Sequence, residues 1–523
     1  MKTRTLLKWA LASVAVAALS GAAQAQTFGG LRGTFNNYRI DRIKHVVVIY
    51  AENRSFDNLY GRFPGVDGLG NANAASSFRI QKDRDGSVLK VLPPVWGGLT
   101  AAGVVPVITQ AQTDNMANQP FAIDASNGYN ASIGVTTRDL WHRFYQNQMQ
   151  INNGANDKFA AWADSGGLVM GNYSATLPLW SYAKRYTLAD HFFMAAFGGS
   201  FLNHQYLICS CAPYYPNADT SVAKNSIAVV NADGVSLTVS AASPASALTG
   251  TPKFVNDGAI TPDFYAVNTF QPPYQPSAIA PATGQDPAYA NPASASVLPA
   301  QTQQTIGDLL STAGVSWAWY AGAWQAALNG QNASPVPNFQ YHHQPFNYFS
   351  AYAPGTAARS AHLLDGGLGG VNFIADIDAG KLPAVAFYKP QGNLNEHAGY
   401  TDVLDGDNHI ANILAHLEKS PQWSDMLVIV TYDENGGFWD HASPPKGDRF
   451  GPGSRIPALI ISPYSRKGLV DHTVYDTTSI IRFLTRRYGL PTLPGVAARD
   501  AGIKKQGGQP IGDLTGALMF PGR

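Results

Sequence analysis

The sequence predicts an α/β fold in which a mostly parallel central sheet is sandwiched between helices. Runs rich in apolar and β-branched residues recur along the chain, and segments with a helical pattern lie between them. This alternation is typical of parallel strands that are connected by helices. With 523 residues, the chain is long enough for one large α/β domain with insertions or for two domains.

The expected elements can be placed on the chain in order. The expected strands are the apolar runs at residues 45–50, 315–320, 384–388, 426–432 and 456–462. The expected helices are residues 303–312, 409–419 and 477–488, the last with Asp476 as a candidate N-cap. Residues 66–130 and 216–300 lack a sustained period of either kind, so we expect loop or small β-rich insertions there.

Residues 1–25 are predicted to be a secretory signal peptide. Lys2, Arg4 and Lys8 precede the short apolar run WALASVAVAALSGA, and AQA at residues 23–25 is a small-x-small cleavage site. A membrane anchor is the alternative, but the apolar run is too short to span a bilayer. We therefore expect an exported protein, periplasmic or secreted, without stable membrane insertion.

Composition narrows the classes of partner and metal. The formal net charge is +1 and only 14% of residues are charged, so bulk charge does not favour nucleic acid or an anionic membrane as a partner. The two cysteines are Cys209 and Cys211. An exporting route permits a disulfide between them, and two buried free thiols are the alternative. Two thiols alone make a poor zinc site.

Two of the expected strands end in similar polar residues. VVVIYAEN at residues 46–53 is matched by LVIVTYDEN at residues 427–435. In a parallel sheet both ends can lie at the same edge, where α/β proteins bind ligands. Carboxylates packed together there raise one another's pKa unless a cation lies among them. Oxygen ligands favour Mg²⁺, Ca²⁺ or Mn²⁺, and the candidate residues are Glu52, Asn53, Asp433, Glu434 and Asn435. The alternative is that both tips are ordinary polar starts of loops.

A glycine-rich turn offers a candidate nucleophile. Gly198 and Gly199 precede Ser200, and an apolar segment of helical length follows. Such a turn would place the hydroxyl at the start of a helix, where backbone N–H groups can hold an anion. A serine of this kind becomes nucleophilic when a metal lowers the pKa of its hydroxyl. The alternative is a serine that only caps the helix.

Several histidines lie in loops bounded by Gly, Pro or Asn. Loop histidines are plausible proton donors or anion contacts, although any single one is more often a surface or packing residue. The candidates are His142, His342, His343 and His397, with His441 in the segment FWDHASPP.

These motifs resemble those of a bacterial phosphoesterase family that contains phospholipases C and acid phosphatases of the AcpA type. The similar segments are HVVVIYAENRSFDNLYG, NGANDKFAAW, FGGSFLNH, YHHQPFNYF, NEHAGYTDVLDGDNHI and VTYDENGGFWDHASPP, in this order over residues 40–490. That family is similar to the alkaline phosphatase and sulfatase superfamily. The resemblance implies an alkaline-phosphatase-like fold and a single phosphoesterase domain over residues 26–523.

The resemblance also implies a role for each motif residue. One divalent metal ion would be bound by Glu52, Asn53, Ser200, Asp433 and Glu434. Ser200 would be the nucleophile that forms a phosphoserine intermediate. The phosphoryl group would be surrounded by His142, His342, His343 and His397, and the substrate would be contacted by Asn53, His142, His343 and His397. Arg54 is expected to pair with a carboxylate, and His441 to lie outside the metal ligands.

The turn at the nucleophile favours one branch of the family. Phospholipases C of the family tend to carry Gly-Pro-Thr there, whereas this chain has Gly199-Ser200-Phe201. We therefore expect an acid phosphatase that acts on phosphorylated small molecules, with a phospholipase C or phosphodiesterase as the alternative. Two alternatives come from other classes: a binding protein that captures phosphate ligands without turnover, and a mainly structural extracellular protein.

Overall fold

The computed structural model describes residues 39–74 and 80–520, so the predicted signal peptide lies outside the described residues. In this part of the chain, eight strands form the main sheet in the order β11-β4-β10-β9-β1-β8-β6-β7. Strand β10 is antiparallel to both of its neighbours, and all other neighbouring pairs are parallel. The prediction of a mostly parallel sheet is confirmed.

The bounds of the elements are as follows. The strands of the main sheet are β1 (His45–Ala51), β4 (Thr187–Ala189), β6 (Trp317–Gly322), β7 (Leu363–Gly367), β8 (Val385–Lys389), β9 (Met426–Tyr432), β10 (Ala458–Ile461) and β11 (Leu469–Asp471). Two small parallel pairs lie apart from it, formed by β2 (Phe121–Ala122) with β3 (Gly171–Asn172), and by β5 (Phe192–Phe193) with β12 (Tyr475–Asp476). The helices are α2 (Phe56–Leu59), α3 (Leu69–Ala74), α4 (Phe144–Ile151), α5 (Trp180–Arg185), α6 (Ser200–Cys209), α7 (Ile306–Thr312), α8 (Trp324–Leu328), α9 (Ala357–His362), α10 (Val371–Asp378), α11 (Val403–Leu417), α12 (Thr478–Tyr488) and α13 (Pro494–Lys505).

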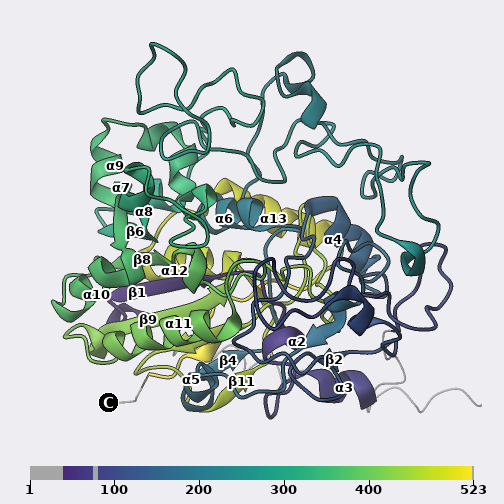
Figure 1. Ribbon diagram of the computed structural model, residues 1–523. Coiled ribbons are helices and arrows are strands. Elements are labelled where there is room, and N and C mark those ends of the chain that lie inside the picture. The colour runs from purple at the N-terminus through teal and green to yellow at the C-terminus, as the bar shows by residue number, and fades with distance from the viewer. Residues whose placement is uncertain (1–38, 75–79, 521–523) are drawn as a thin grey trace, which may run out of the picture.

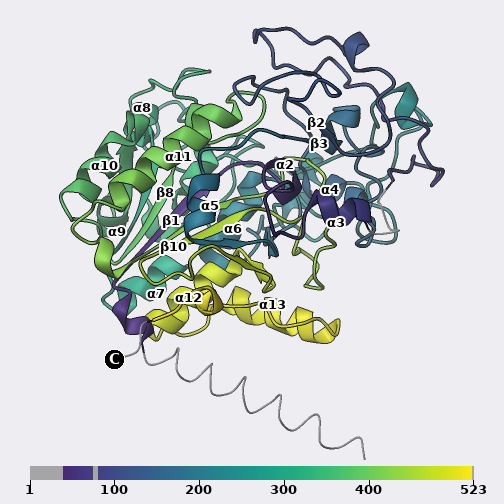
Figure 2. The ribbon, with the colours of Figure 1, turned by 90° about the horizontal axis from the view of Figure 1, so that it is seen from below.

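Helices cover both faces of the sheet. Figure 2 shows α10 and α11 on one side of the strands and α7, α12 and α13 on the other. The central strands are accordingly buried along their length, and β9 has no exposed residue from Met426 to Tyr432. A strand that is covered on both faces has to be apolar at consecutive positions. The continuous apolar runs seen in the sequence therefore become the middle of the sheet.

Some predicted bounds need correction. The helix expected at residues 409–419 begins earlier, at Val403, because the side chain of Asp402 accepts a hydrogen bond from Asp405 N and caps the first turn. The N-cap of α12 is Thr477 rather than Asp476. The carboxylate of Asp476 nevertheless accepts a hydrogen bond from Thr478 N at 2.8 Å, so it still satisfies one free N–H group of that turn.

The long insertion at residues 216–300 consists of loops. It contains three 3₁₀ turns and isolated bridges but no strand of a ladder. In Figure 1 it forms the teal loops at the top of the molecule. Of the two predicted forms, the loop form is therefore correct. On the N-terminal side of the insertion, Cys209, the last residue of α6, forms a disulfide with Cys211, so the alternative of two free thiols is wrong. None of the described helices combines the length and apolar character that crossing a bilayer requires.

Candidate active site

The two polar strand tips lie side by side. Strands β1 and β9 are parallel neighbours, and Ala51 pairs with Tyr432 at the end of the ladder. The segments that follow the two strands therefore leave the sheet side by side, and Asn53 N donates to the Asp433 carboxylate at 3.1 Å. Next to it, Arg54 N donates to the main-chain oxygen of Glu434 at 3.0 Å. The prediction that both tips share one edge of the sheet is confirmed.

The backbone at these tips is closely packed. Asn53 has a φ angle of 63°, in the left-handed region that asparagine tolerates better than most residues. Opposite it, Gly436 has a φ angle of 60°, and a Cβ atom at that position would lie 2.2 Å from Asn53 O. The DENGG sequence therefore supplies a glycine where the second tip turns directly against the first.

Ser200 is the first residue of α6, and the two glycines before it are explained by their surroundings. Gly198 has a φ angle of 88°, and a Cβ atom there would lie 2.4 Å from Phe144 N. Gly199 is the N-cap of the helix. Ser200 therefore follows the N-cap, and its Oγ donates to Asn53 Oδ1 at 3.1 Å and approaches Glu434 Oε1 at 3.5 Å. The alternative of a simple N-cap serine is therefore wrong.

Glu52 occupies the other end of the cluster, in contact with a lysine and a histidine. Its Oε1 lies 2.8 Å from the Nζ atom of Lys389, the last residue of β8, and also contacts His343 Nε2. Its Oε2 accepts a hydrogen bond from the Tyr400 hydroxyl at 3.0 Å. Lys389 and Glu52 are both fully buried. The sequence analysis did not select Lys389, although it directly follows an expected strand whose end lies at the same edge of the sheet.

Three of the predicted histidines, His142, His342 and His397, line a pocket of about 360 Å³ that opens on Ser200, whereas the fourth, His343, is buried against Glu52 and is not part of that lining. His142 and His397 each bond a main-chain oxygen through Nδ1, those of Leu140 and Ala398. Their Nε2 atoms face the cluster: that of His142 lies 3.3 Å from Asn53 Nδ2, and that of His397 lies 4.0 Å from Glu52 Oε2. The pocket is lined by, among others, His142, Ser200, Asn268, His342, His397 and Tyr400.

Burial and the neighbouring charges shift the pKa values of the carboxyl groups in this cluster. Burial, and after it the charge of Glu52, together raise the pKa of Asp433 to about 7. Burial likewise raises the pKa of Glu434 above its usual range, although His142 opposes this effect. Glu52 behaves differently, because His343 and Lys389 outweigh its burial and lower the pKa of its carboxyl group. Ionisation of two of the three carboxyl groups, those of Asp433 and Glu434, is therefore unfavourable, and a nearby cation would remove this free-energy cost.

The donor set fits a divalent metal ion. Asp433 Oδ2 is buried and has no hydrogen-bond partner among the described residues. One ligand atom from each of Glu52, His204 and Asp433 lies within 4.8 Å of the others. A buried carboxylate oxygen without a donor is costly unless a metal or water fills the place. The carboxylates, with the oxygens of Asn53 and Ser200, form the kind of ligand set that hard cations prefer.

His204 is a further site residue that sequence reasoning missed. It lies one helical turn after Ser200 on α6, and its Nδ1 donates to Ser200 O at 2.7 Å. Its Nε2 is buried without a hydrogen-bond partner in the described chain. The i, i+4 spacing from Ser200 was a signal that could have identified it.

The expectation for Arg54 is wrong. Its guanidinium does not pair with a carboxylate but donates to the main-chain oxygen of Glu396, through Nε at 2.9 Å and through a terminal nitrogen at 2.7 Å. It also lies over the ring of Phe438, 5.1 Å from the centroid. The guanidinium thus anchors the loop that carries His397 to the first strand tip.

Comparisons with known proteins agree with the motifs. The profile of the Phosphoesterase family matches residues 43–491, which confirms the family resemblance. Phospholipase C B of Mycobacterium tuberculosis is 24% identical over 516 residues, covering 91% of this chain and 78% of that protein. Non-hemolytic phospholipase C of Pseudomonas aeruginosa is 28% identical over 254 residues, covering 42% of this chain and 33% of that protein.

Among solved structures, a protein of the alkaline phosphatase superfamily from Vibrio parahaemolyticus is similar at 12% identity with a TM-score of 0.32. The match covers 73% of this chain and 71% of that protein. A score of this size is too low to bear on the chemistry of the site.

Proposed function

The chain belongs to the Phosphoesterase family and is a hydrolase of phosphoric ester bonds, and on that premise we propose that it is an exported, metal-dependent phosphomonoesterase with Ser200 as its nucleophile. The observation that supports this proposal best is the position of the Ser200 hydroxyl. It lies at the start of a helix, within 3.5 Å of Asn53 and Glu434, and it faces the pocket.

The divalent ion would be held by residues of both tips and the helix start, namely Glu52, Asn53, Ser200, Asp433 and Glu434. When bound, it would supply positive charge that offsets the carboxylates and the phosphate, and it would lower the pKa of the serine hydroxyl. The buried, unpartnered oxygen of Asp433 supports its presence. Mg²⁺, Ca²⁺ and Mn²⁺ suit these ligands better than Zn²⁺.

The chemical steps follow from the positions of the side chains. Ser200 Oγ attacks phosphorus in line with the leaving group, the bond from phosphorus to the leaving oxygen breaks, and the hydroxyl proton passes to Glu434. His142, His342 and His397, which line the pocket, surround the equatorial phosphoryl oxygens, and His343 instead contacts Glu52. His142 donates a proton to the leaving oxygen, because its Nε2 faces the site. Water then attacks the phosphoserine and gives a proton to His142, the bond from phosphorus to Ser200 Oγ breaks, and Ser200 Oγ takes back the proton from Glu434 as phosphate is released.

The size of the pocket supports a small monoester. A volume of about 360 Å³ lined largely by polar side chains suits a phosphate group with a short alcohol. Phospholipase C activity is a second candidate, which the names of the similar proteins favour. A phosphodiester would need room at the site for its second ester group.

One set of assays separates the candidates. The purified protein is tested against p-nitrophenyl phosphate, bis-p-nitrophenyl phosphate and phosphatidylcholine vesicles from pH 4 to 8, with and without a chelator. We expect hydrolysis of the monoester, its loss with the chelator, and weak or no hydrolysis of the other two. Preferential hydrolysis of phosphatidylcholine would favour the phospholipase reading. Binding of phosphate without turnover of any ester would contradict an enzymatic role.

Export is tested separately. We expect the mature protein isolated from culture to begin at Gln26, the residue after the proposed cleavage site. A full-length protein that retains Met1 and remains in the cytoplasm would contradict the proposal of export.

A further inference from the structure

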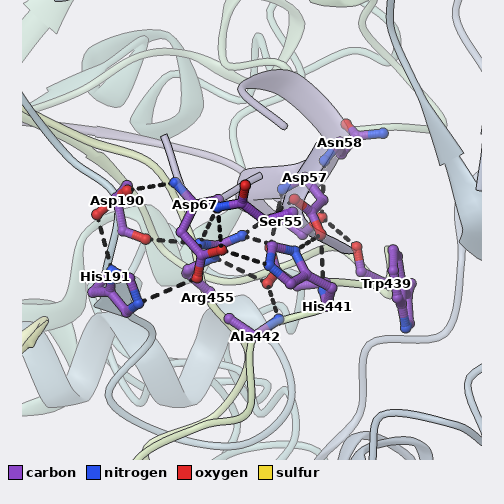
Figure 3. A network of polar contacts seen from close by, with 12 residues as sticks. Ser55, Asp57, Asn58, Asp67, Asp190, His191, Trp439, His441, Ala442 and Arg455 are labelled. Carbon is purple, nitrogen blue, oxygen red and sulfur yellow. Dashed lines mark hydrogen bonds and ion pairs between the residues drawn. The ribbon is translucent and has the colours of Figure 1, made fainter. Parts of the chain in front are cut away.

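A second network of charged side chains lies behind the strand tips, and the proposed chemistry does not use it. Figure 3 shows Arg455 at its centre, surrounded by acidic and imidazole side chains. The Arg455 side chain is fully buried. Its Nε donates to Asp440 at 3.0 Å, and one terminal nitrogen donates to Asp57 at 3.1 Å. The other terminal nitrogen donates to the main-chain oxygens of Asp67 and Asp190, at 2.7 and 2.9 Å.

These contacts join the three segments that carry the proposed metal ligands. Asp57 lies in α2, four residues after Asn53, and Asp440 lies six residues after Glu434. Asp57 N also donates to the Asp440 carboxylate at 3.0 Å, and Ser55 Oγ donates to Trp439 O at 2.8 Å. The third segment runs from Asp190 toward Ser200, and Met194 N in it donates to Ser454 O, next to Arg455, at 3.0 Å.

His441 closes the network on its outer side. Its Nδ1 lies 2.7 Å from an Asp57 oxygen, and its Nε2 lies 3.1 Å from Asp67. Although burial opposes the effect, Asp57 and then Asp67 raise the pKa of His441 to about 10. Beyond it, His191 bridges Asp67 and Asp190, and His472 contacts Asp190. At neutral pH the ring of His441 is therefore a cation between two carboxylates.

The network needs no metal of its own. Both oxygens of Asp57 and both oxygens of Asp440 accept hydrogen bonds, from Arg455, His441, Ala442 N or Asp57 N. The guanidinium already supplies the buried positive charge. A charged group that is fully hydrogen-bonded in this way holds its neighbours in one arrangement.

We propose that Arg455, Asp57, Asp440 and His441 form a positioning network that fixes the two strand tips relative to each other and thereby sets the affinity of the protein for its divalent metal ion. The inference rests on the proposed metal site. Residues that orient metal ligands without touching the metal commonly change metal affinity by about 10- to 100-fold when mutated.

The test compares His441→Gln with a matched control, His45→Gln. Glutamine can donate to one carboxylate but cannot bridge Asp57 and Asp67. His45 is also bonded through both ring nitrogens, to Asp425 at 2.7 Å and to Gln422 at 2.7 Å. It lies at the other end of β1 from Glu52, about 23 Å away at roughly 3.3 Å per residue. The dissociation constant for Mn²⁺ is measured by titration calorimetry on metal-free protein, and kcat is measured against Mn²⁺ concentration.

We expect H441Q to weaken Mn²⁺ binding about 10-fold or more, with kcat returning to within a few-fold of wild type at saturating Mn²⁺. H45Q is expected to bind Mn²⁺ within two-fold of wild type. Arg455→Lys, which keeps a cation, is expected to lose less affinity than Arg455→Met. Equal Mn²⁺ affinities in wild type, H441Q and H45Q would overturn the inference, even if R455M fails to fold. A wild-type protein that binds no Mn²⁺, Mg²⁺ or Ca²⁺ would overturn the proposed metal site as well.

Discussion

The buried ion pair between Lys389 and Glu52 leads to a quantitative prediction for Lys389→Met. Methionine has a similar length but carries no charge, so the variant leaves Glu52 with one cationic partner fewer. The Nζ atom lies 2.8 Å from Glu52 Oε1, and both side chains are fully buried. Solvent therefore cannot replace the lost charge without rearrangement of the site.

The expected loss of stability in K389M can be estimated from the burial of the ion pair. Removing one partner of a buried ion pair costs about 3–5 kcal/mol. An unfolding entropy of about 2.1 cal/mol/K per residue gives about 1.1 kcal/mol/K for 523 residues, so the melting temperature should fall by about 3–5 °C. A bound divalent ion would supply positive charge near Glu52, so the fall in melting temperature should be smaller when Mn²⁺ is added.

The assay is thermal unfolding followed by calorimetry, in chelator and in Mn²⁺. Lys467→Met is the control. Lys389 Nζ donates to Ala51 O at 3.4 Å and lies over the Tyr50 ring. Lys467 Nζ likewise donates to Ser462 O at 3.0 Å and lies over the Tyr186 ring. It has no carboxylate at ion-pairing distance among the described residues, and its loss should cost less than about 1 kcal/mol. A melting temperature for K389M within 1 °C of wild type in chelator would refute the reasoning.

Three further predictions follow from the contacts. Asn53→Ala removes the acceptor for Ser200 Oγ and a neighbour of His142, and we expect kcat to fall by about 10²- to 10³-fold with little change in melting temperature; a fall of less than three-fold would contradict this role. The folded-state pKa of His441, about 10, lies above the unfolded value of about 6.5. Its stabilising effect is thus complete below pH 6.5 and is lost as the pH rises toward 10, by up to about 1.4 kcal/mol per pH unit. The melting temperature of wild type should therefore fall more steeply than that of H441Q between pH 7.5 and 9, and parallel profiles would show that the ring is uncharged. Chelation should lower the melting temperature of wild type, by an amount equivalent to about 2.7 kcal/mol if the metal had been present at 100 times its dissociation constant; identical melting curves with and without chelator would contradict a bound metal.

Much of the site could be predicted from the sequence, because its residues follow continuous apolar strands. The two tips share a pattern, and the parallel pairing of β1 with β9 converts that shared pattern into proximity. The GGS turn could be interpreted for a similar reason, since the glycines and the apolar segment that follows indicate a helix start.

Other contacts depend on tertiary packing that no local pattern encodes. Lys389 becomes a neighbour of Glu52 only because β8 lies beside β1. Arg54 lies in a charged motif, but its partner is a main-chain oxygen more than 300 positions away, so the sequence suggested a carboxylate instead. Arg455 gave no local signal, since three of its partners, Asp57, Asp67 and Asp190, lie more than 260 positions away along the chain.

The most direct test of the account asks whether a phosphoryl group becomes attached to Ser200 during turnover. Wild-type protein and Ser200→Ala are mixed with a phosphomonoester, quenched in acid within the first turnover, digested and examined by mass spectrometry. We expect one phosphoryl group on the peptide that contains Ser200 in wild type. We expect none in S200A, which should still bind Mn²⁺ and unfold at a similar temperature. Turnover by S200A at a rate near that of wild type, or a phosphoryl group on another residue, would contradict this expectation.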